Sequence, residues 1–99
     1  MDDVAWIRFT QSARRHRVAA GRAREVLADP YVLVPMPVGS ERDRMWMHLG
    51  DDASGRALEV GVFYSGEQLL VAHVMDLRAK FRPLYEQAKA VHARERGTS

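Results

Sequence analysis

The chain predicts an α+β fold, with a small antiparallel sheet of about four to five strands, two helices before the sheet and one helix after it. Three observations support this prediction. Helical spacing of apolar residues comes first, a period of two takes over after Pro30, and helical spacing returns at the end. The 99 residues suffice for one domain with a modest core. We therefore expect one domain over residues 1–93 and a flexible tail over residues 94–99.

The N-terminal third predicts one strand and two helices. Residues 4–9, VAWIRF, are strand-favouring types. Thr10 can cap a first helix over SARRHRV, residues 12–18. A second helix is predicted over residues 19–28, AAGRAREVLA, whose apolar stripe consists of Ala19, Ala23, Val26 and Leu27. It ends at Asp29-Pro30, because proline disfavours helical geometry in the residue before it.

Four further strands follow. Residues 31–37, YVLVPMP, contain prolines that suit a sheet edge. Residues 42–50 alternate, with Met45, Met47 and Leu49 on one face and Arg44, Trp46 and His48 on the other. Residues 56–64 follow an ASG turn and place on one face Leu58, Val60, Val62 and Tyr64. The SGEQ turn leads into residues 69–75, LLVAHVM, which are apolar on both faces and favour a central position.

The closing helix has an apolar stripe at the spacing of an amphipathic helix, formed by Leu77, Phe81, Leu84, Tyr85 and Ala88. Pro83 allows two starts for this helix. With Asp76 as N-cap, Pro83 falls in the second turn, where it removes a hydrogen bond and clashes. We favour the alternative, in which the helix begins near Lys80 and residues 76–78 form a turn before it.

Composition excludes several classes of protein. With 46% hydrophobic and 28% charged residues, the chain is typical of a globular domain. No apolar run approaches the roughly 20 residues of a membrane span, and the first residues lack signal-peptide features, so we expect a cytoplasmic protein without membrane contact. The absence of cysteine excludes a disulfide framework and a thiolate metal site. Asp51-Asp52 lack a third ligand, and we predict no metal and no cofactor.

Positive charge is concentrated rather than abundant. The net charge is only +2. Within the first 24 residues, six arginines face only Asp2 and Asp3, a local excess of +4. Of the 15 basic residues, only Lys80 and Lys89 are lysine. Arginine suits bidentate phosphate contact, whereas a GC-rich genome also favours arginine, and the sequence leaves both explanations open.

Three cations crowd the start of the closing helix: Arg78, Lys80 and Arg82. The N-terminal end of a helix carries about half a positive charge, so each surface cation there costs about 0.3–1 kcal/mol. One interpretation is plain solvated charge. The other is that these cations bind an anion at a strand-to-helix junction.

Two of the four histidines lie on predicted strands, and histidine can act as acid or base near neutral pH. His48 shares a face with Arg44 and Trp46, an arrangement that could stack a base and hold its phosphate; the alternative is a packing face. His73 lies five residues before Arg78. It is either a site residue or a core histidine. Tyr85 is either a core residue with its hydroxyl at the rim or a site residue. No role is assigned to His16 or His92.

The order of segments resembles a known family. The residues that carry the resemblance are His16-Arg17-Val18, Glu25-Val26-Leu27, Asp29, Pro30, Trp46, Leu49, Gly50, Ser54-Gly55-Arg56, Leu58, Val60, Val62, Lys80, Arg82, Leu84, Tyr85 and Glu86. Over roughly residues 4–87 they resemble the BrnT family of toxins from bacterial toxin–antitoxin pairs. The resemblance implies a RelE-like or barnase-like fold, a ribonuclease that arrests translation, and a ribbon-helix-helix antitoxin as partner. The chain departs from the family at Arg17, Gly21-Arg22, Met75-Asp76 and Pro83.

RNA cleavage without a metal needs a base, cations on the phosphate, and an acid for the leaving oxygen. The candidate catalytic residues are His48, His73, Arg78, Lys80, Arg82 and Tyr85. The candidate RNA contacts are Arg44, Trp46, Arg78, Lys80 and Arg82.

Three functions remain open at this level: a ribonuclease toxin, an inactive toxin-like module that binds RNA or an antitoxin, and a plain protein–protein adaptor. The inactive module is motivated by the family's arginine cluster, which Met75-Asp76 replaces here. An apolar edge at residues 31–37 could pair with a partner, and a homo- or hetero-oligomer is equally open.

Overall fold

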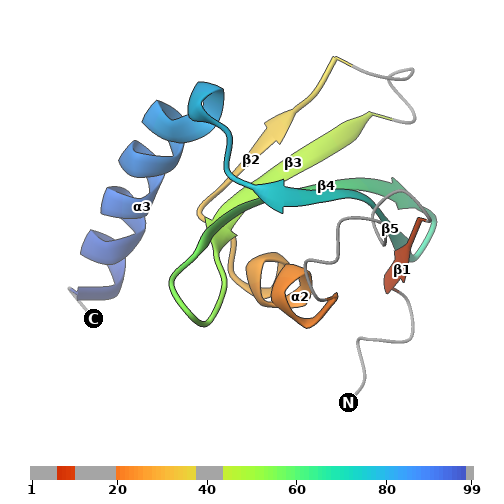
Figure 1. Cartoon of the computed structure of the whole chain (residues 1–99), viewed down its shortest axis with the longest axis horizontal. Helices are drawn as coiled ribbons and strands as arrows, with labels where there is room; N and C mark the ends of the chain where they lie inside the picture. Colours follow the sequence, from red (N-terminus) through yellow and green to blue (C-terminus); the bar gives the residue numbers. More distant parts are fainter. Residues whose placement is uncertain (1–6, 11–19, 38–43, 98–99) are drawn as a thin grey trace.

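The computed structural model describes residues 7–10, 20–37 and 44–97 (Figure 1). In chain order the elements are β1 (Ile7–Phe9), α2 (Ala20–Ala28), β2 (Val32–Pro35), β3 (Met45–Asp51), β4 (Ala57–Ser65), β5 (Gln68–Asp76), the 3-10 helix η2 (Ala79–Phe81) and α3 (Arg82–Gly97). This is an α+β arrangement, as predicted. The predicted helix over residues 12–18 and the first half of the predicted strand over residues 4–9 lie outside the described residues.

The five strands form one mixed sheet in the order β1-β5-β4-β3-β2. β1 pairs with β5 in parallel, and the other neighbours pair antiparallel, so the prediction of an antiparallel sheet is wrong at this one edge. A parallel pair needs a long connection, and α2 and three strands separate β1 from β5 in the chain. β2 lies at an edge, as its prolines predicted, and the central strand is β4 rather than β5.

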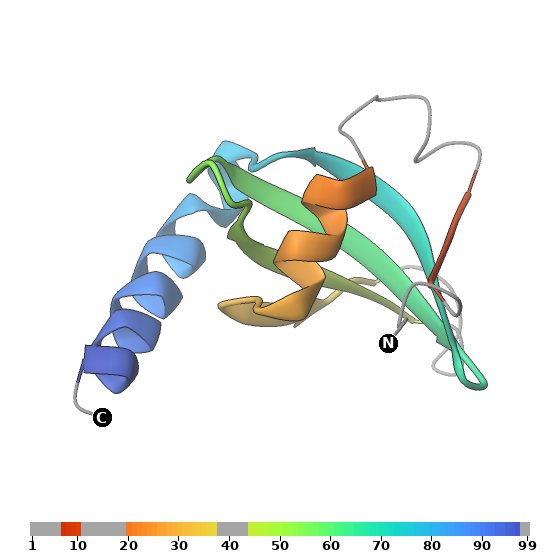
Figure 2. The same ribbon diagram turned by 90° about the horizontal axis from the view of Figure 1, so that it is seen from below.

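The two helices pack against different faces of the sheet. α2 buries Ala23 and Val26 against a cluster that includes Val60 of β4. On the opposite face, Phe81 and Tyr85 pack against a second cluster that includes Met47. We call these the α2 face and the α3 face. Figure 2 shows α2 lying across the sheet, with α3 at one end of the molecule.

A β-bulge in β5 changes which residues point to each face. Gly61 of β4 pairs with His73, whereas its neighbour Val62 pairs with Val71, so Ala72 is an extra residue in β5. Strict alternation would place Val71 and His73 on the same face. Because of the bulge, Val71 is buried with the α2 cluster and His73 points to the α3 face.

The turns of the sheet follow ordinary turn chemistry. The two-residue loop between β4 and β5 begins with Gly66 at φ +61°, the left-handed conformation that such hairpin loops require. Between β3 and β4, Asp52 Oδ1 accepts hydrogen bonds from the backbone N–H groups of Ser54 and Arg56, and Gly55 has φ +89°. Both hairpins fix the register that aligns β3, β4 and β5.

The closing helix begins late, as favoured from the sequence. η2 precedes α3, and Pro83 is the second residue of α3, where a backbone N–H would have no partner within the helix. Its predicted stripe is only partly buried, because Leu84 is 39% exposed. Residues 94–97, predicted as a tail, belong to α3, and Arg96 Nη2 lies 2.7 Å from Asp29 Oδ2. No helix among the described residues is long and apolar enough to cross a membrane.

Candidate active site

The centre of the candidate site is Glu59, the third residue of β4. Its neighbours Leu58 and Val60 point to the α2 cluster, so Glu59 points to the α3 face. The residue is fully buried. A buried carboxylate is costly unless it is paired and hydrogen-bonded, and the contacts of Glu59 show how this cost is offset.

Glu59 accepts hydrogen bonds from two residues of different elements. His73 of β5 donates from Nε2 to Glu59 Oε2 at 2.8 Å. Arg78, between β5 and η2, donates its backbone N–H to Oε1 at 2.9 Å and its Nε to Oε2 at 2.8 Å. The Nη2 atom of Arg78 lies 2.7 Å from the same Oε2. One carboxylate therefore fixes both a histidine and an arginine.

The electrostatics of this cluster keep Glu59 ionised. Burial raises the pKa of Glu59, but hydrogen bonds from Arg78 and His73 lower it by more, and its pKa lies below the usual range. The same bond to Glu59 raises the pKa of Arg78. The side chains of His73 and Arg78 remain 26% and 39% exposed. The buried carboxylate therefore holds an imidazole and a guanidinium at the surface, where a ligand can reach them.

The tautomer of His73 follows from its contact. An ionised carboxylate only accepts, so Nε2 of His73 carries the proton that it donates to Glu59. In the neutral ring the lone pair is then on Nδ1. An imidazole oriented in this way by a carboxylate can take a proton from a substrate hydroxyl.

The other two cations near the start of the helix also lie over aromatic rings, and Lys80 shares its ring with Arg78. The guanidinium of Arg78 and the ammonium of Lys80 lie 5.5 Å and 5.1 Å from the centroid of the Phe81 ring. Arg82 lies over the Tyr85 ring and forms an exposed pair with Glu86. The three cations that crowd the start of the helix therefore have different surroundings, and Arg78 is the one held against a buried acid.

His48, the other predicted strand histidine, lies on the opposite face of the sheet. It pairs across the strands with Val60 of the α2 cluster and is 4% exposed. Its Nδ1 donates to the Trp46 carbonyl at 3.1 Å, and Tyr64 donates its hydroxyl to Nε2 at 2.9 Å. Burial lowers the pKa of His48, although the backbone hydrogen bonds oppose this effect. The structure does not bring His48 and His73 into one site.

The remaining predicted residues divide between the two faces. Trp46 is half-buried on the α2 face, opposite Val62 of β4, and Arg44 directly precedes β3. Tyr85 is 3% exposed on the α3 face, where its hydroxyl donates to Asp51 Oδ1 and Lys89 Nζ lies 3.3 Å away. Tyr85 thus fastens α3 to the end of β3, with its ring in the core and its hydroxyl bound to Asp51.

The two adjacent aspartates do not act together. Asp51 binds Tyr31, Tyr85 and Lys89, whereas Asp52 accepts a hydrogen bond from the Ser54 hydroxyl in the turn before β4. Across the described ranges, no three His, Cys, Asp or Glu residues gather in a way that would hold a metal ion.

Sequence reasoning missed Glu59, the residue that organises the site. The available signal was one acid in the middle of the apolar stretch ALEVGVF, with apolar neighbours on both sides. Such an acid on a strand that packs on both faces predicts a buried charge that needs a cationic partner.

No protein-family model, curated protein or solved structure matches this chain.

Proposed function

We propose that the chain is a ribonuclease toxin of a toxin–antitoxin pair and cleaves RNA without a metal ion. His73 is the base, Glu59 is a positioning residue, and Arg78 is the phosphate contact. The observation that carries this proposal is the buried carboxylate of Glu59, which binds both His73 and Arg78. The resemblance to BrnT-family toxins supports RNA as the substrate class and a ribbon-helix-helix antitoxin as the partner.

The chemistry uses the 2′-hydroxyl of RNA as the nucleophile. His73 accepts the 2′-hydroxyl proton at Nδ1, and the 2′-oxygen attacks the adjacent phosphorus. The bond between phosphorus and the 5′-oxygen breaks as the new bond forms, the leaving 5′-oxygen takes a proton from water, and the products are a 2′,3′-cyclic phosphate and a 5′-hydroxyl. Glu59 stabilises the imidazolium that forms, because its carboxylate already accepts the Nε2 proton.

Arg78 is suited to hold the phosphate while it remains bound to Glu59. A guanidinium has five N–H donors, and the side-chain contacts to Glu59 occupy only one edge of the fork. The other donors can approach phosphate oxygens and stabilise the negative charge that grows in the transition state. We assign no chemical step to His48, Lys80, Arg82 or Tyr85.

The test is cleavage of a labelled RNA by the purified chain in the presence of EDTA. We expect fragments that end in a 2′,3′-cyclic phosphate, and no cleavage where the nucleotide before the scissile bond is 2′-deoxy. His73→Ala should lower the rate by about 10²–10⁴-fold, the usual contribution of a general base. Cleavage that is unchanged in His73→Ala, or that needs a divalent metal, would contradict the proposal.

Arg56→Ala is the matched control for Arg78→Ala. Arg56 also binds a carboxylate through two nitrogens, but its partner Asp76 is 60% exposed and lies opposite Leu58, on the α2 face. We expect Arg78→Ala to lose most of the cleavage rate and Arg56→Ala to retain it. Equal losses in the two variants would remove Arg78 from the site.

One observation favours the second candidate function, an inactive module that binds RNA. Glu59 already neutralises Arg78, which leaves less charge to stabilise the transition state, whereas Lys80 over the same Phe81 ring stays exposed and can contact RNA. This function predicts RNA binding that weakens steeply as salt rises, with no fragments from wild type. Salt-sensitive binding without cleavage would therefore select the module over the enzyme, and induced expression should then cause no growth arrest.

A further inference from the structure

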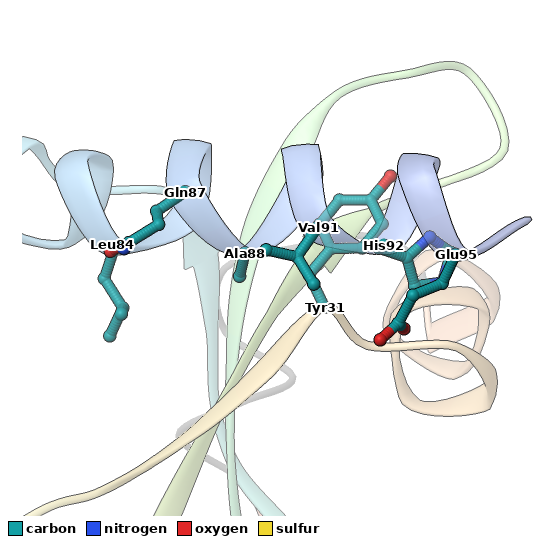
Figure 3. Close-up of a pocket in the computed structure, with 7 residues that line it drawn as sticks. All are labelled: Tyr31, Leu84, Gln87, Ala88, Val91, His92 and Glu95. Atoms are coloured by element: carbon teal, nitrogen blue, oxygen red, sulfur yellow. The ribbon is translucent and has the colours of Figure 1, made fainter. Parts of the chain in front are cut away.

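One side of α3 is apolar and exposed. Leu84 and Val91 are each 39% exposed, and Ala88 lies between them on the same side of the helix. Together with Tyr31, they line a groove of about 290 Å³ along α3. Figure 3 shows the side chains of Leu84, Ala88 and Glu95 directed to the same side of α3, with the Tyr31 ring behind the helix.

The Tyr31 ring, which forms one wall of this groove, is fixed by contacts with its neighbours. The Tyr31 ring packs edge-on against His92 at 4.8 Å between centroids and lies 5.9 Å from Tyr85. Its hydroxyl donates to Asp51 at 3.0 Å. A partner therefore meets a surface that is formed before binding, which limits the entropy cost of association.

The spacing of this side of the helix reads the same in both directions. The residues on this side are Lys80 in η2, directly before α3, and Leu84, Gln87 with Ala88, Val91 and Glu95 in α3. The midpoint falls between Gln87 and Ala88, with Leu84 and Val91 equally far from it. A surface with this symmetry fits a second copy of itself when the two helices run antiparallel.

Charge at the two ends fits the same arrangement. Lys80 and Glu95 are both exposed and stand at opposite ends of the stripe. In an antiparallel pair centred between Gln87 and Ala88, Lys80 of one copy faces Glu95 of the other, and this contact occurs twice. The small side chain of Ala88 at the centre allows the helices to approach closely.

We infer that the apolar side of α3 joins two copies of this chain into a symmetric dimer of antiparallel α3 helices. A single helix pair buries less than the roughly 1,200 Å² of a standard interface, so the dimer is weak and exchanges readily. The inference does not depend on the proposed ribonuclease activity.

The first test uses the absence of cysteine from the chain. Ala88→Cys places one thiol next to the symmetry axis, and we expect a disulfide-linked dimer under mild oxidation. Leu33→Cys is the matched control, because Leu33 is also exposed, at 40%, but lies on another surface. Glu95→Cys should also stay unlinked, since the two copies of residue 95 are at opposite ends. Equal cross-linking at all three positions would overturn the inference.

The second test measures dimer dissociation by sedimentation from low micromolar to near-millimolar chain. Leu84→Glu should weaken the dimer by at least about 10-fold, because it buries a charge in an apolar contact, and Leu33→Glu should not. Lys80→Glu and Glu95→Lys should each weaken it, and the double variant should restore it. A wild-type chain that is monomeric throughout, or a double variant no tighter than the single ones, would overturn the proposed dimer. Circular dichroism checks that each variant is folded.

Discussion

His48 and His73 lie on strands that flank β4, yet they have opposite surroundings. His48 is buried, and its partners are a backbone carbonyl and a tyrosine hydroxyl. His73 is partly exposed, and its partner is a buried carboxylate. The first environment encloses the ring and lowers its pKa by burial, whereas the second holds a partly exposed ring against a buried anion. The partner and the exposure, not the residue type, separate a packing histidine from a candidate base.

The largest expected effect on stability is the loss of His48. His48→Ala should lower the free energy of unfolding by about 2–3 kcal/mol, because it leaves a cavity and breaks two hydrogen bonds in the interior. His73→Ala should cost less than about 1 kcal/mol, since its ring is partly hydrated and Arg78 still pairs with Glu59. Urea unfolding of both variants measures the difference. Equal costs would mean that the two histidines have the same structural role.

Arg78→Ala should lower stability by about 2 kcal/mol at neutral pH, because it removes the strongest partner of a buried carboxylate, while His73 and water compensate in part. Arg56→Ala, which breaks an exposed pair, should cost less than about 0.5 kcal/mol.

The cost of Arg78→Ala should shrink in acid. The folded-state pKa of Glu59 lies below its usual value of 4.5, so its stabilisation is present above that pH and is lost as the pH falls through the folded-state pKa. Unfolding measured from pH 7 to pH 3 tests this. A cost that stays constant with pH would mean that the charge of Glu59 is not the cause.

A smaller effect concerns the pH dependence of His48. Burial lowers its folded-state pKa below 6.5, so the unfolded chain binds more protons at a pH just below that value. Stability should therefore fall as the pH drops below 6.5, with a slope of at most about 1.4 kcal/mol per pH unit from this residue. His48→Phe should remove this part of the slope, whereas His73→Ala should leave it in place.

The smallest expected effect is that of Tyr64→Phe. It removes the hydroxyl that donates to His48 Nε2 but keeps the ring, and Tyr64 is 46% exposed, so the cost should be about 0.5–1 kcal/mol. The NMR signals of the His48 ring should change in the same variant, and those of the His73 ring should not. A shift at His73 would indicate coupling between the two faces.

Much of the fold follows from local pattern in the sequence. The alternation of Met45, Met47 and Leu49 against Trp46 and His48 predicted the two faces of β3, and these faces are confirmed. The prolines of residues 31–37 predicted an edge strand, and β2 is one. These predictions hold because strand alternation and proline geometry depend on the chain alone.

The exposed side of α3 shows where local pattern fails. Leu84 fits the apolar stripe as well as Tyr85 does, yet it is exposed while Tyr85 is buried. The spacing of a helix gives the width of its apolar face, but the position of the neighbouring strands decides which part of that face is covered.

The sequence by itself determined the element types, the late start of α3 and the presence of a histidine and cations near its beginning. Only the tertiary structure decided that His73 meets Glu59. Alternation would have turned His73 toward the face of Val71, and the extra residue Ala72 turns it to the other face. The bulge is a register shift of one residue between β4 and β5. Register depends on the pairing of the two strands in the folded sheet and not on either strand alone.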